Sequence, residues 1–281
     1  GVFKNRIWIL GGGTYDTPLK PKRIFYNDAW SSGDGVKWEQ QVKAAPLLHA
    51  AKSNSMTTGE IRRRLDRWGE AQLPPGLGIR SVTPIAVFDT GLRPHPQLDS
   101  WDIRAISFLD GRRGETLDEE GHGTAMLYLI VSVLAGERPD RFPIQMYRVL
   151  DENGCGTLSD LLEAMDHALR ADFRVWSLSL GLEDCTRCRR GVLCRAVEAV
   201  AEKGVLVVGA AGNEGMVGAV CSPGESRGAV CCAAVDADLL VADFSNRGPS
   251  LMGDAKPDMS MFGVNISMDC CDEPISGTSP A

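Results

Sequence analysis

The stretch GVLVVGAAGNEG (residues 204–215) joins a helix end, a strand and a polar loop. Gly204 follows the amphipathic run 192–203, in the position where helices commonly end on glycine. Residues 205–210 are continuously apolar, which is typical of a strand covered on both faces. Asn213 lies just beyond this strand. A helix that leads into a doubly covered strand predicts an α/β fold, in which polar groups gather where the strands end.

The same alternation of strand and helix extends in both directions along the chain. Apolar runs typical of buried strands lie at residues 84–88, 144–150, 175–180 and 229–235. Residues 157–170 predict an amphipathic helix that begins with a sequence resembling a capping box, Thr157-x-x-Asp160. Its apolar face comprises Leu158, Leu161, Leu162, Met165 and Leu169. The apolar stretch 126–135 predicts a further core helix. The sequence therefore predicts a doubly wound, mostly parallel sheet with helices on both faces.

Four short motifs follow one another at predicted strand ends and turns. They are Asp89-Thr90-Gly91, Gly121-His122-Gly123-Thr124, Ala211-Gly212-Asn213 and Gly277-Thr278-Ser279-Pro280-Ala281. They supply an acid, a base, an amide donor and a hydroxyl, the parts needed to cleave an acyl bond without a metal. In isolation Asp89 is typical of a turn, His122 of a core histidine and Ser279 of a helix cap. Four motifs in one order predict a catalytic site instead.

The chemistry assigns each of these side chains a role. A serine hydroxyl is a poor nucleophile until a base removes its proton, so Ser279 requires His122 as that base. Asp89 would hold the His122 tautomer and stabilise the imidazolium. The Asn213 amide and the Ser279 backbone N–H would donate to the oxyanion. Pro280 favours a first helical position, so Ser279 is expected at a helix N-terminus.

The chain resembles the subtilisin-like serine proteases, the subtilases, over residues 81–281. The resemblance rests on IAVFDTGLRPHPQL (85–98), GHGTAM (121–126), YRVLDENGCGTLSD (147–160), WSLSLG (176–181), GVLVVGAAGNEG (204–215), FSNRGP (244–249), KPDMSMFGVNI (256–266) and SGTSPA (276–281). It implies a serine endopeptidase that hydrolyses peptide bonds with Asp89, His122 and Ser279 as its triad and Asn213 in its oxyanion hole. The substrate partner is then a polypeptide.

Substrate binding is also implied by the resemblance. In the family an extended peptide pairs with two exposed strand edges, which here match Gly154-Cys155-Gly156 and Ser179-Leu180-Gly181. Ala210-Ala211-Gly212 and Ser222-Pro223-Gly224 would line the pocket for the residue before the scissile bond. Because these residues are small, the pocket is expected to admit a large apolar side chain.

The sequence departs from the family pattern at three places that matter. Gln97 stands where many relatives carry a calcium-ligating Asp, so calcium is in doubt and we expect no cofactor and no metal. Cys155 replaces the usual serine beside the substrate strand. The sequence stops two residues after Ser279, before the family's next helix. We therefore expect a catalytic domain truncated behind its nucleophile, and an inactive chain as given.

Two further segments precede the catalytic domain. Residues 1–43 contain a strand at 6–10, a second strand opening at Asn27, a turn at Asp34-Gly35 and three tryptophans. They resemble one kelch-type propeller blade; the alternative is a small hairpin extension in which Trp8, Trp30 and Trp38 pack together. Residues 44–80 predict a linker with one amphipathic helix at 58–70, laid on the following domain.

Composition limits partners and location. A net charge of -7 gives no electrostatic reason to expect nucleic acid as a partner, and no apolar run approaches the roughly 20 residues of a spanning helix. Nine cysteines cannot all pair internally. We interpret Cys231, Cys232, Cys270 and Cys271 as small core residues, and favour a local disulfide over zinc for Cys185, Cys188 and Cys194. Location stays open between secretion, by resemblance, and the cell interior, by the free thiols.

Two other functions compete with a general endopeptidase. One is a non-catalytic binding module, in which the blade recognises a protein or sugar and the truncated protease domain is inert. The other keeps the fold but assigns a narrow processing role inside the cell. Reaction with a fluorophosphonate probe distinguishes the first from catalysis, and the pairing state of the cysteines bears on the second.

Overall fold

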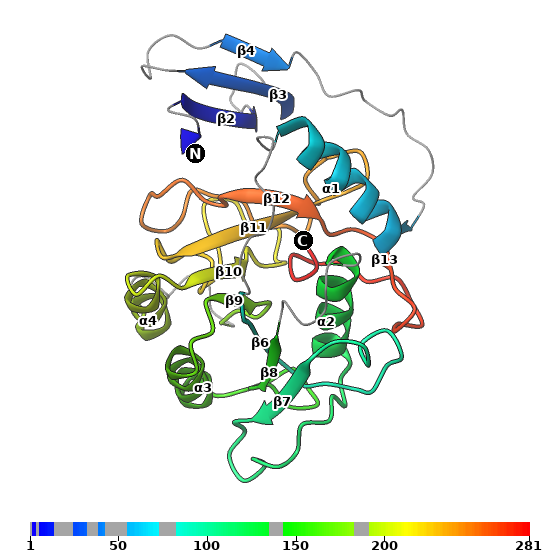
Figure 1. Ribbon diagram of the computed structural model, residues 1–281. Helices are drawn as coiled ribbons and strands as arrows, with labels where there is room; N and C mark the ends of the chain where they lie inside the picture. Colours follow the sequence, from blue (N-terminus) through cyan, green and yellow to red (C-terminus); the bar gives the residue numbers. More distant parts are fainter. Residues whose placement is uncertain are drawn as a thin grey trace. The chain divides into compact units, whose positions relative to one another are not determined.

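The computed structural model describes residues 2–3, 6–13, 25–32, 39–42, 55–72, 83–134, 143–182 and 191–281 (Figure 1). The chain divides into two compact units. The first comprises Gly1–Ser53 with Ala237–Leu240, and the second comprises Asn54–Asp236 with Val241–Ala281.

The first unit contains a four-stranded antiparallel sheet whose strands follow chain order. These strands are β1 (Val2–Phe3), β2 (Arg6–Gly13), β3 (Phe25–Ser32) and β4 (Glu39–Val42). Each strand pairs with the next, so the sheet is a meander. The expected turn at Asp34-Gly35 and the packing of the three tryptophans lie outside what the structure describes.

The second unit is built on a seven-stranded parallel sheet. Its strand order is β12-β11-β10-β9-β6-β8-β7, and every neighbouring pair is parallel. The strands are β6 (Ile85–Asp89), β7 (Ile103–Ser107), β8 (Ile144–Arg148), β9 (Val175–Leu178), β10 (Leu206–Ala210), β11 (Ala229–Val235) and β12 (Met259–Phe262). The five buried strands predicted from apolar runs are confirmed. The two edge strands, β7 and β12, lack such runs because solvent reaches part of them.

Helices cover both faces of this sheet, as predicted. Alternate residues of β6 separate the two cores: Phe88 packs with α3 (Leu158–Arg170) and α4 (Val192–Ala201), while Val87 packs with α2 (His122–Val133). Figure 1 shows α3 and α4 on the side of the sheet opposite α2. The fold class is therefore the α/β arrangement that the sequence indicates.

The helix ends follow the local sequence signals. Thr157 caps α3 by accepting a hydrogen bond from the Asp160 N–H at 3.1 Å. Gly204 adopts φ +84 just beyond α4, a conformation that favours glycine. The helix expected from residue 126 begins earlier, at His122, because Gly121 with φ 108 turns the chain directly into the first turn.

A short strand and a helix ahead of the sheet belong to the second unit. The strand β5 (Met56–Thr57) pairs in parallel with β13 (Ile266–Ser267). The helix α1 (Thr58–Gln72) contacts α2, and the Arg62 guanidinium donates to the Val133 carbonyl. The Arg64 guanidinium also lies 5.2 Å from the centre of the Phe262 ring. These contacts join the helix expected in the 44–80 linker to the α/β unit.

The strand order places one strand end in a position suited to function. The chain runs from β6 to β7 at one edge, returns through β8, and then continues on the other side of β6 through β9. Open parallel sheets form a crevice at such a switch point, outside the carboxyl ends of the strands. Asp89 is the last residue of β6 and lies at this point. Within the parts described, no helix is long and apolar enough to cross a bilayer.

The buried face of α4 generates a test of the core. Leu193 is completely buried, whereas Leu206 at the start of β10 is 48% exposed. We expect Leu193→Ala to lower the free energy of unfolding by about 2–5 kcal/mol, because it leaves a cavity, and Leu206→Ala to change it by less than about 1 kcal/mol. Urea denaturation followed by circular dichroism measures both variants. Equal losses for the two leucines would contradict the assignment of this face to the core.

Candidate active site

Asp89 is a buried carboxylate at the carboxyl end of β6, with no solvent exposure. Its Oδ1 accepts hydrogen bonds from the Thr90 N–H at 2.8 Å and from His122 Nδ1 at 2.7 Å. A buried carboxylate needs such donors, because burial without them disfavours its charged form. The other oxygen, Oδ2, has no hydrogen-bond partner among the described residues. The structure thus brings together the predicted acid and base.

His122 reaches Asp89 because the backbone around it is made of glycine. A Cβ atom on Gly123 would lie 2.6 Å from the Gly91 carbonyl oxygen and 3.2 Å from Asp89 Cβ. Any larger residue at this position would therefore push the start of α2 away from the end of β6. The glycine that follows His122 in the motif is therefore required by the close contact between the start of α2 and the end of β6.

The charge state of His122 is set by two opposing effects. Burial alone lowers its pKa, since it disfavours the imidazolium. The Asp89 carboxylate acts in the opposite direction, through its charge and its hydrogen bond, and Glu120 and Asp118 add to it. The net result is a pKa raised above the ordinary value of 6.5. His122 is therefore suited to take up and hold a proton.

Ser279 lies beside the end of β9 rather than hydrogen-bonded to His122. Its Oγ donates to the Ser179 carbonyl oxygen at 3.1 Å, and Ser179 Oγ donates to the Ser279 carbonyl oxygen at 3.2 Å. No hydrogen bond joins Ser279 and His122 in the described part of the chain. The reason is local: the strand ends at Leu178, so the Ser179 carbonyl is an available acceptor. The expected serine–histidine contact is absent from this state of the site.

Asn213 is oriented by Thr278, a residue to which the sequence assigns no role. Its Oδ1 accepts from the Thr278 N–H at 2.8 Å and from Thr278 Oγ1 at 3.0 Å. The Thr278 hydroxyl in turn accepts from the Gly212 N–H at 3.1 Å. With its oxygen engaged, Asn213 presents its amide N–H group next to Gly277, 3.6 Å from where a Cβ would stand. Nδ2 forms no hydrogen bond to the described residues, so it can donate to a ligand.

A cavity of about 550 Å³ adjoins His122. Its walls include Gly154, Cys155 and Gly156 on one side and Ser179, Leu180 and Gly181 on the other. These are the two segments expected to flank an extended substrate. They follow β8 and β9, the neighbours of β6, so the cavity opens at the switch point.

The loop that carries Cys155 is fixed by Asp151. The Asp151 Oδ1 atom accepts from the N–H groups of Asn153 and Cys155, at 2.8 Å and 3.0 Å. These two backbone hydrogen bonds lower the pKa of Asp151. A Cβ on Gly156 would lie 2.1 Å from the Val149 carbonyl oxygen, so glycine is required there. The Cys155 thiol is free and exposed.

The other expected substrate segments are buried against each other. Ala211, Ser222, Pro223 and Gly224 are buried, and a Cβ on Gly224 would lie 2.6 Å from the Ala210 carbonyl oxygen. These residues and Gly212 are not among those that line the cavity beside His122. Their contact with the residue before the scissile bond stays a prediction.

The cysteines correct part of the sequence interpretation. Cys194 is buried on α4 and forms no disulfide, while Cys185 and Cys188 lie outside the described residues, so the local disulfide expected among these three cysteines stays a prediction. Cys221 is disulfide-bonded, and its partner also lies outside them. Cys231 and Cys232 are buried in β11, as expected.

Cys270 and Cys271 are only half-buried. Their sulfur atoms are 3.7 Å apart in the loop after β13, rather than in the core as expected.

The residues around Gln97 do not fit the calcium ion that the family resemblance raises. Gln97 donates through Nε2 to Ser132 Oγ at 2.8 Å, so this side chain is engaged with α2. It also brings no negative charge, whereas calcium sites are built from carboxylate and carbonyl oxygens. Among the described residues, no group of three or more His, Cys, Asp or Glu side chains could hold a metal ion.

Sequence reasoning also misses a buried aspartate near the Asp89–His122 pair. Asp118 has no solvent exposure. It accepts hydrogen bonds from Thr90, which follows Asp89 in the chain, and from Gly121, which precedes His122. Its only sequence signal is its position three residues before Gly121, which is equally typical of an exposed turn.

Comparison with known proteins gives one consistent family. Residues 81–281 match the model of the Subtilase family. The chain is 34% identical over 258 residues to the serine protease AprX of Bacillus subtilis (strain 168), covering 82% of this chain and 54% of AprX. It is 31% identical over 210 residues to Subtilisin Savinase of Lederbergia lenta, covering 71% and 72% of the two chains. The chain thus spans only about half the length of AprX.

Solved structures share the fold. The prenylagaramide maturation protease PagA aligns with a TM-score of 0.54 at 21% identity, over 72% of this chain and 71% of PagA. The psychrophilic subtilisin-like protease Apa1 from Pseudoalteromonas sp. AS-11 aligns with a TM-score of 0.52 at 24% identity, over 64% of this chain and 41% of Apa1. The family model covers most of the chain and the parallel sheet agrees with these structures: the chain belongs to the subtilase family.

Proposed function

We propose that residues 81–281 are the catalytic domain of a serine endopeptidase that hydrolyses peptide bonds. The observation that carries this proposal is the 2.7 Å hydrogen bond between buried Asp89 and His122 at the switch point of the sheet. A carboxylate that orients a histidine beside a serine is the arrangement that activates a hydroxyl nucleophile. Membership of the subtilase family, and relatives named as serine proteases, support the same class of reaction.

In the proposed mechanism Ser279 Oγ attacks the carbonyl carbon of the scissile bond. Its hydroxyl first turns from the Ser179 carbonyl toward His122, which accepts the proton and later gives it to the leaving amine. Asp89 holds the Nδ1–H tautomer and stabilises the imidazolium. Asn213 Nδ2 and the Ser279 N–H donate to the oxygen that gains negative charge, an interaction worth about two to three orders of magnitude in turnover.

The substrate is a polypeptide in this proposal. An extended segment would pair with residues 154–156 and 179–181, which both line the cavity beside His122. The exposed backbone of Gly154 and Gly156 allows close approach of another chain. Ala210, Gly212 and residues 222–224 are proposed to surround the side chain before the scissile bond.

Residues 1–43 are proposed to be a kelch-like blade, and 44–80 the connection to the catalytic domain. The support is the antiparallel meander β1-β2-β3-β4, because propeller blades are four-stranded antiparallel sheets. This topology also supports the second candidate function, a binding module that recognises a partner without cutting it. The two functions differ in whether Ser279 reacts.

Covalent labelling tests the proposed nucleophile. In a protein extended past residue 281, a fluorophosphonate probe is expected to label Ser279, and Ser279→Ala is expected to abolish labelling, because only an activated serine reacts with such probes. Ser260→Ala, which removes an exposed hydroxyl on the edge strand β12, serves as the matched control and should label normally. Mass spectrometry locates the adduct. An unlabelled protein that still binds polypeptide would support the binding module instead.

The pH dependence tests the proposed base. Neutral His122 is the active form, so the labelling rate rises with pH as the imidazole loses its proton. Because Asp89 holds the pKa of His122 above 6.5, the midpoint of this rise is expected above pH 6.5. Asp89→Asn removes the charge, so it should move the midpoint to lower pH and reduce the maximal rate by about 10⁴-fold. A wild-type midpoint below 6.5 would contradict the assigned pair.

A further inference from the structure

Asp118 is a buried carboxylate that the catalytic mechanism above does not use. It lies in the loop before α2 and accepts four hydrogen bonds. Oδ1 accepts from Thr90 Oγ1 at 2.8 Å and from the Gly121 N–H at 2.7 Å. Oδ2 accepts from the Thr124 N–H at 2.8 Å and from Thr124 Oγ1 at 2.6 Å. These donors fill the site around a carboxylate that has no contact with solvent.

The four donors come from the two segments that carry the predicted acid and base. Thr90 follows Asp89 directly, while Gly121 and Thr124 flank His122 in the chain. A further hydrogen bond ties these segments together: Thr90 Oγ1 accepts from the Gly123 N–H at 2.8 Å. Asp118 therefore binds the end of β6 and the first turn of α2 at once.

The Thr90 hydroxyl has two carboxylates within reach but only one proton to donate. Its oxygen is 2.8 Å from Asp118 Oδ1 and 3.3 Å from Asp89 Oδ1. Donation to Asp118 leaves Asp89 Oδ1 to the Thr90 N–H and to His122 Nδ1. Without an acceptor at residue 118 the hydroxyl would turn to Asp89 and compete with the imidazole for the same oxygen.

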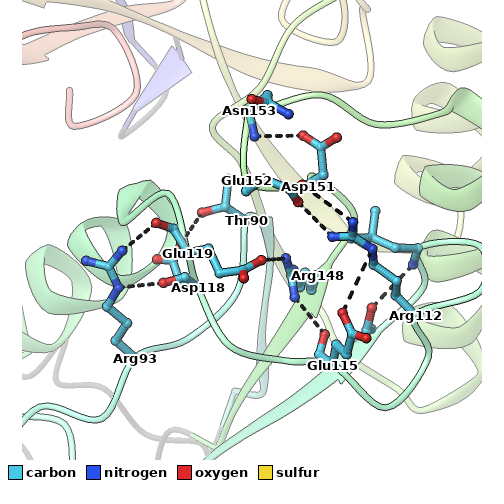
Figure 2. A network of polar contacts seen from close by, with 12 residues as sticks. Thr90, Arg93, Arg112, Glu115, Asp118, Glu119, Arg148, Asp151, Glu152 and Asn153 are labelled. Atoms are coloured by element: carbon cyan, nitrogen blue, oxygen red, sulfur yellow. Dashed lines mark hydrogen bonds and ion pairs between the residues drawn. The ribbon is translucent and has the colours of Figure 1, made fainter.

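The loop that carries Asp118 is itself held in place (Figure 2). Arg148, which is 1% exposed, donates to the Glu115 carbonyl oxygen and to Glu119 Oε2, both at 3.1 Å. Arg93 donates to the carbonyl oxygens of Asp118 and Glu119 from the other side. Two arginines thus clamp the loop, one from the end of β8 and one from the segment after β6.

Asp118 is ionised at neutral pH. Burial alone raises its pKa, but the hydrogen bonds from Thr124, Gly121 and Thr90 outweigh burial and hold the pKa below its ordinary value. A carboxylate accepts hydrogen bonds and donates none, and the two backbone N–H groups that face it can only donate. An amide of the same shape would place its own N–H group against one of these donors.

We propose that Asp118 is a positioning residue for the Asp89–His122 pair: its carboxylate takes the Thr90 hydroxyl proton and fixes the start of α2, so that Asp89 Oδ1 is kept for His122 Nδ1. This proposal rests on the proposed function for its effect on rate. The positioning itself is a property of the two hydrogen-bonded residues, which can be measured without catalysis.

The first test compares Asp118→Asn with Glu115→Gln. Both remove one negative charge from the same loop, but the Glu115 side chain is 62% exposed and, among the described residues, its carboxylate pairs only with Arg112, at 3.9 Å. We expect Asp118→Asn to lower the fluorophosphonate labelling rate by about 10²-fold, because a misplaced catalytic pair loses that much. The midpoint of its pH profile should move to lower pH, while Glu115→Gln keeps the wild-type rate and midpoint.

The second test reads the pair in the unreactive Ser279→Ala protein. Proton NMR gives the pKa of the His122 imidazole and the resonance of its Nδ1–H proton. Besides Asp89 and Asp118, the charged group that faces this residue is Glu120, whose Oε2 accepts from the His122 N–H at 2.6 Å. Adding Asp118→Asn should lower the imidazole pKa and move the Nδ1–H resonance upfield. Adding Glu115→Gln should change neither.

The outcomes separate this proposal from the proposed function. A wild-type protein extended past residue 281 that is still not labelled refutes the endopeptidase, while the NMR comparison still decides the role of Asp118. An unchanged His122 pKa and Nδ1–H resonance in the Asp118→Asn protein would overturn the positioning role. If that variant does not fold, Thr90→Val and Thr90→Ser replace it: the valine should reproduce the losses and the serine should recover most of them. Equal behaviour of these two variants would equally overturn the proposal.

Discussion

The structure depends on burying one carboxylate at the carboxyl end of a strand of the parallel sheet. Asp89 has no solvent exposure, and burying an ion is costly unless hydrogen bonds replace its water. The replacement comes from the Thr90 N–H and from His122, which must therefore stand within 3 Å of the strand end. That requirement explains the glycine at 123, the start of α2 at His122 and the hydrogen bonds that tie the two segments.

The order of the strands turns this local requirement into a site. The strands β8 and β9 lie on opposite sides of β6. The loops that follow them therefore diverge, and a cavity of about 550 Å³ lies beside His122. The loop after β8 is shaped by Asp151 and by the steric demand at Gly156, and the segment after β9 supplies the carbonyl that binds Ser279. The cavity, the Asp89–His122 pair and the contact between Ser279 and Ser179 all follow from the same topology.

Much of the fold can be read from the sequence because buried parallel strands are continuously apolar. The runs around Val87 and Val207 are examples, and the Thr157 cap and Gly204 mark helix ends by their own chemistry. The two edge strands are not predicted because their composition is mixed: Arg104 in β7 and Ser260 in β12 interrupt the apolar run. Likewise the parallel strand order follows from long-range packing, which no local signal encodes.

The candidate site is predictable to the same degree. Asp89, His122 and Asn213 are found because each lies in a short motif at a strand end, and the structure brings the first two into contact. The Ser279 hydroxyl bonds to the Ser179 carbonyl, a backbone acceptor that no sequence motif singles out. Asp118 and Thr278 escape because a buried acceptor and a surface turn share the same sequence signature.

The distance along the chain between His122, the proposed base, and Ser279, the proposed nucleophile, has a consequence for biosynthesis. Residues 122 and 279 are 157 positions apart, from 279 minus 122, so at about 5–20 residues per second a ribosome needs about 8–30 s to pass from one to the other. Throughout that interval the nascent polypeptide contains Asp89 and His122 but not yet Ser279. The proposed catalytic site, assembled in this order, lacks its proposed nucleophile until nearly all of residues 81–281 have been made.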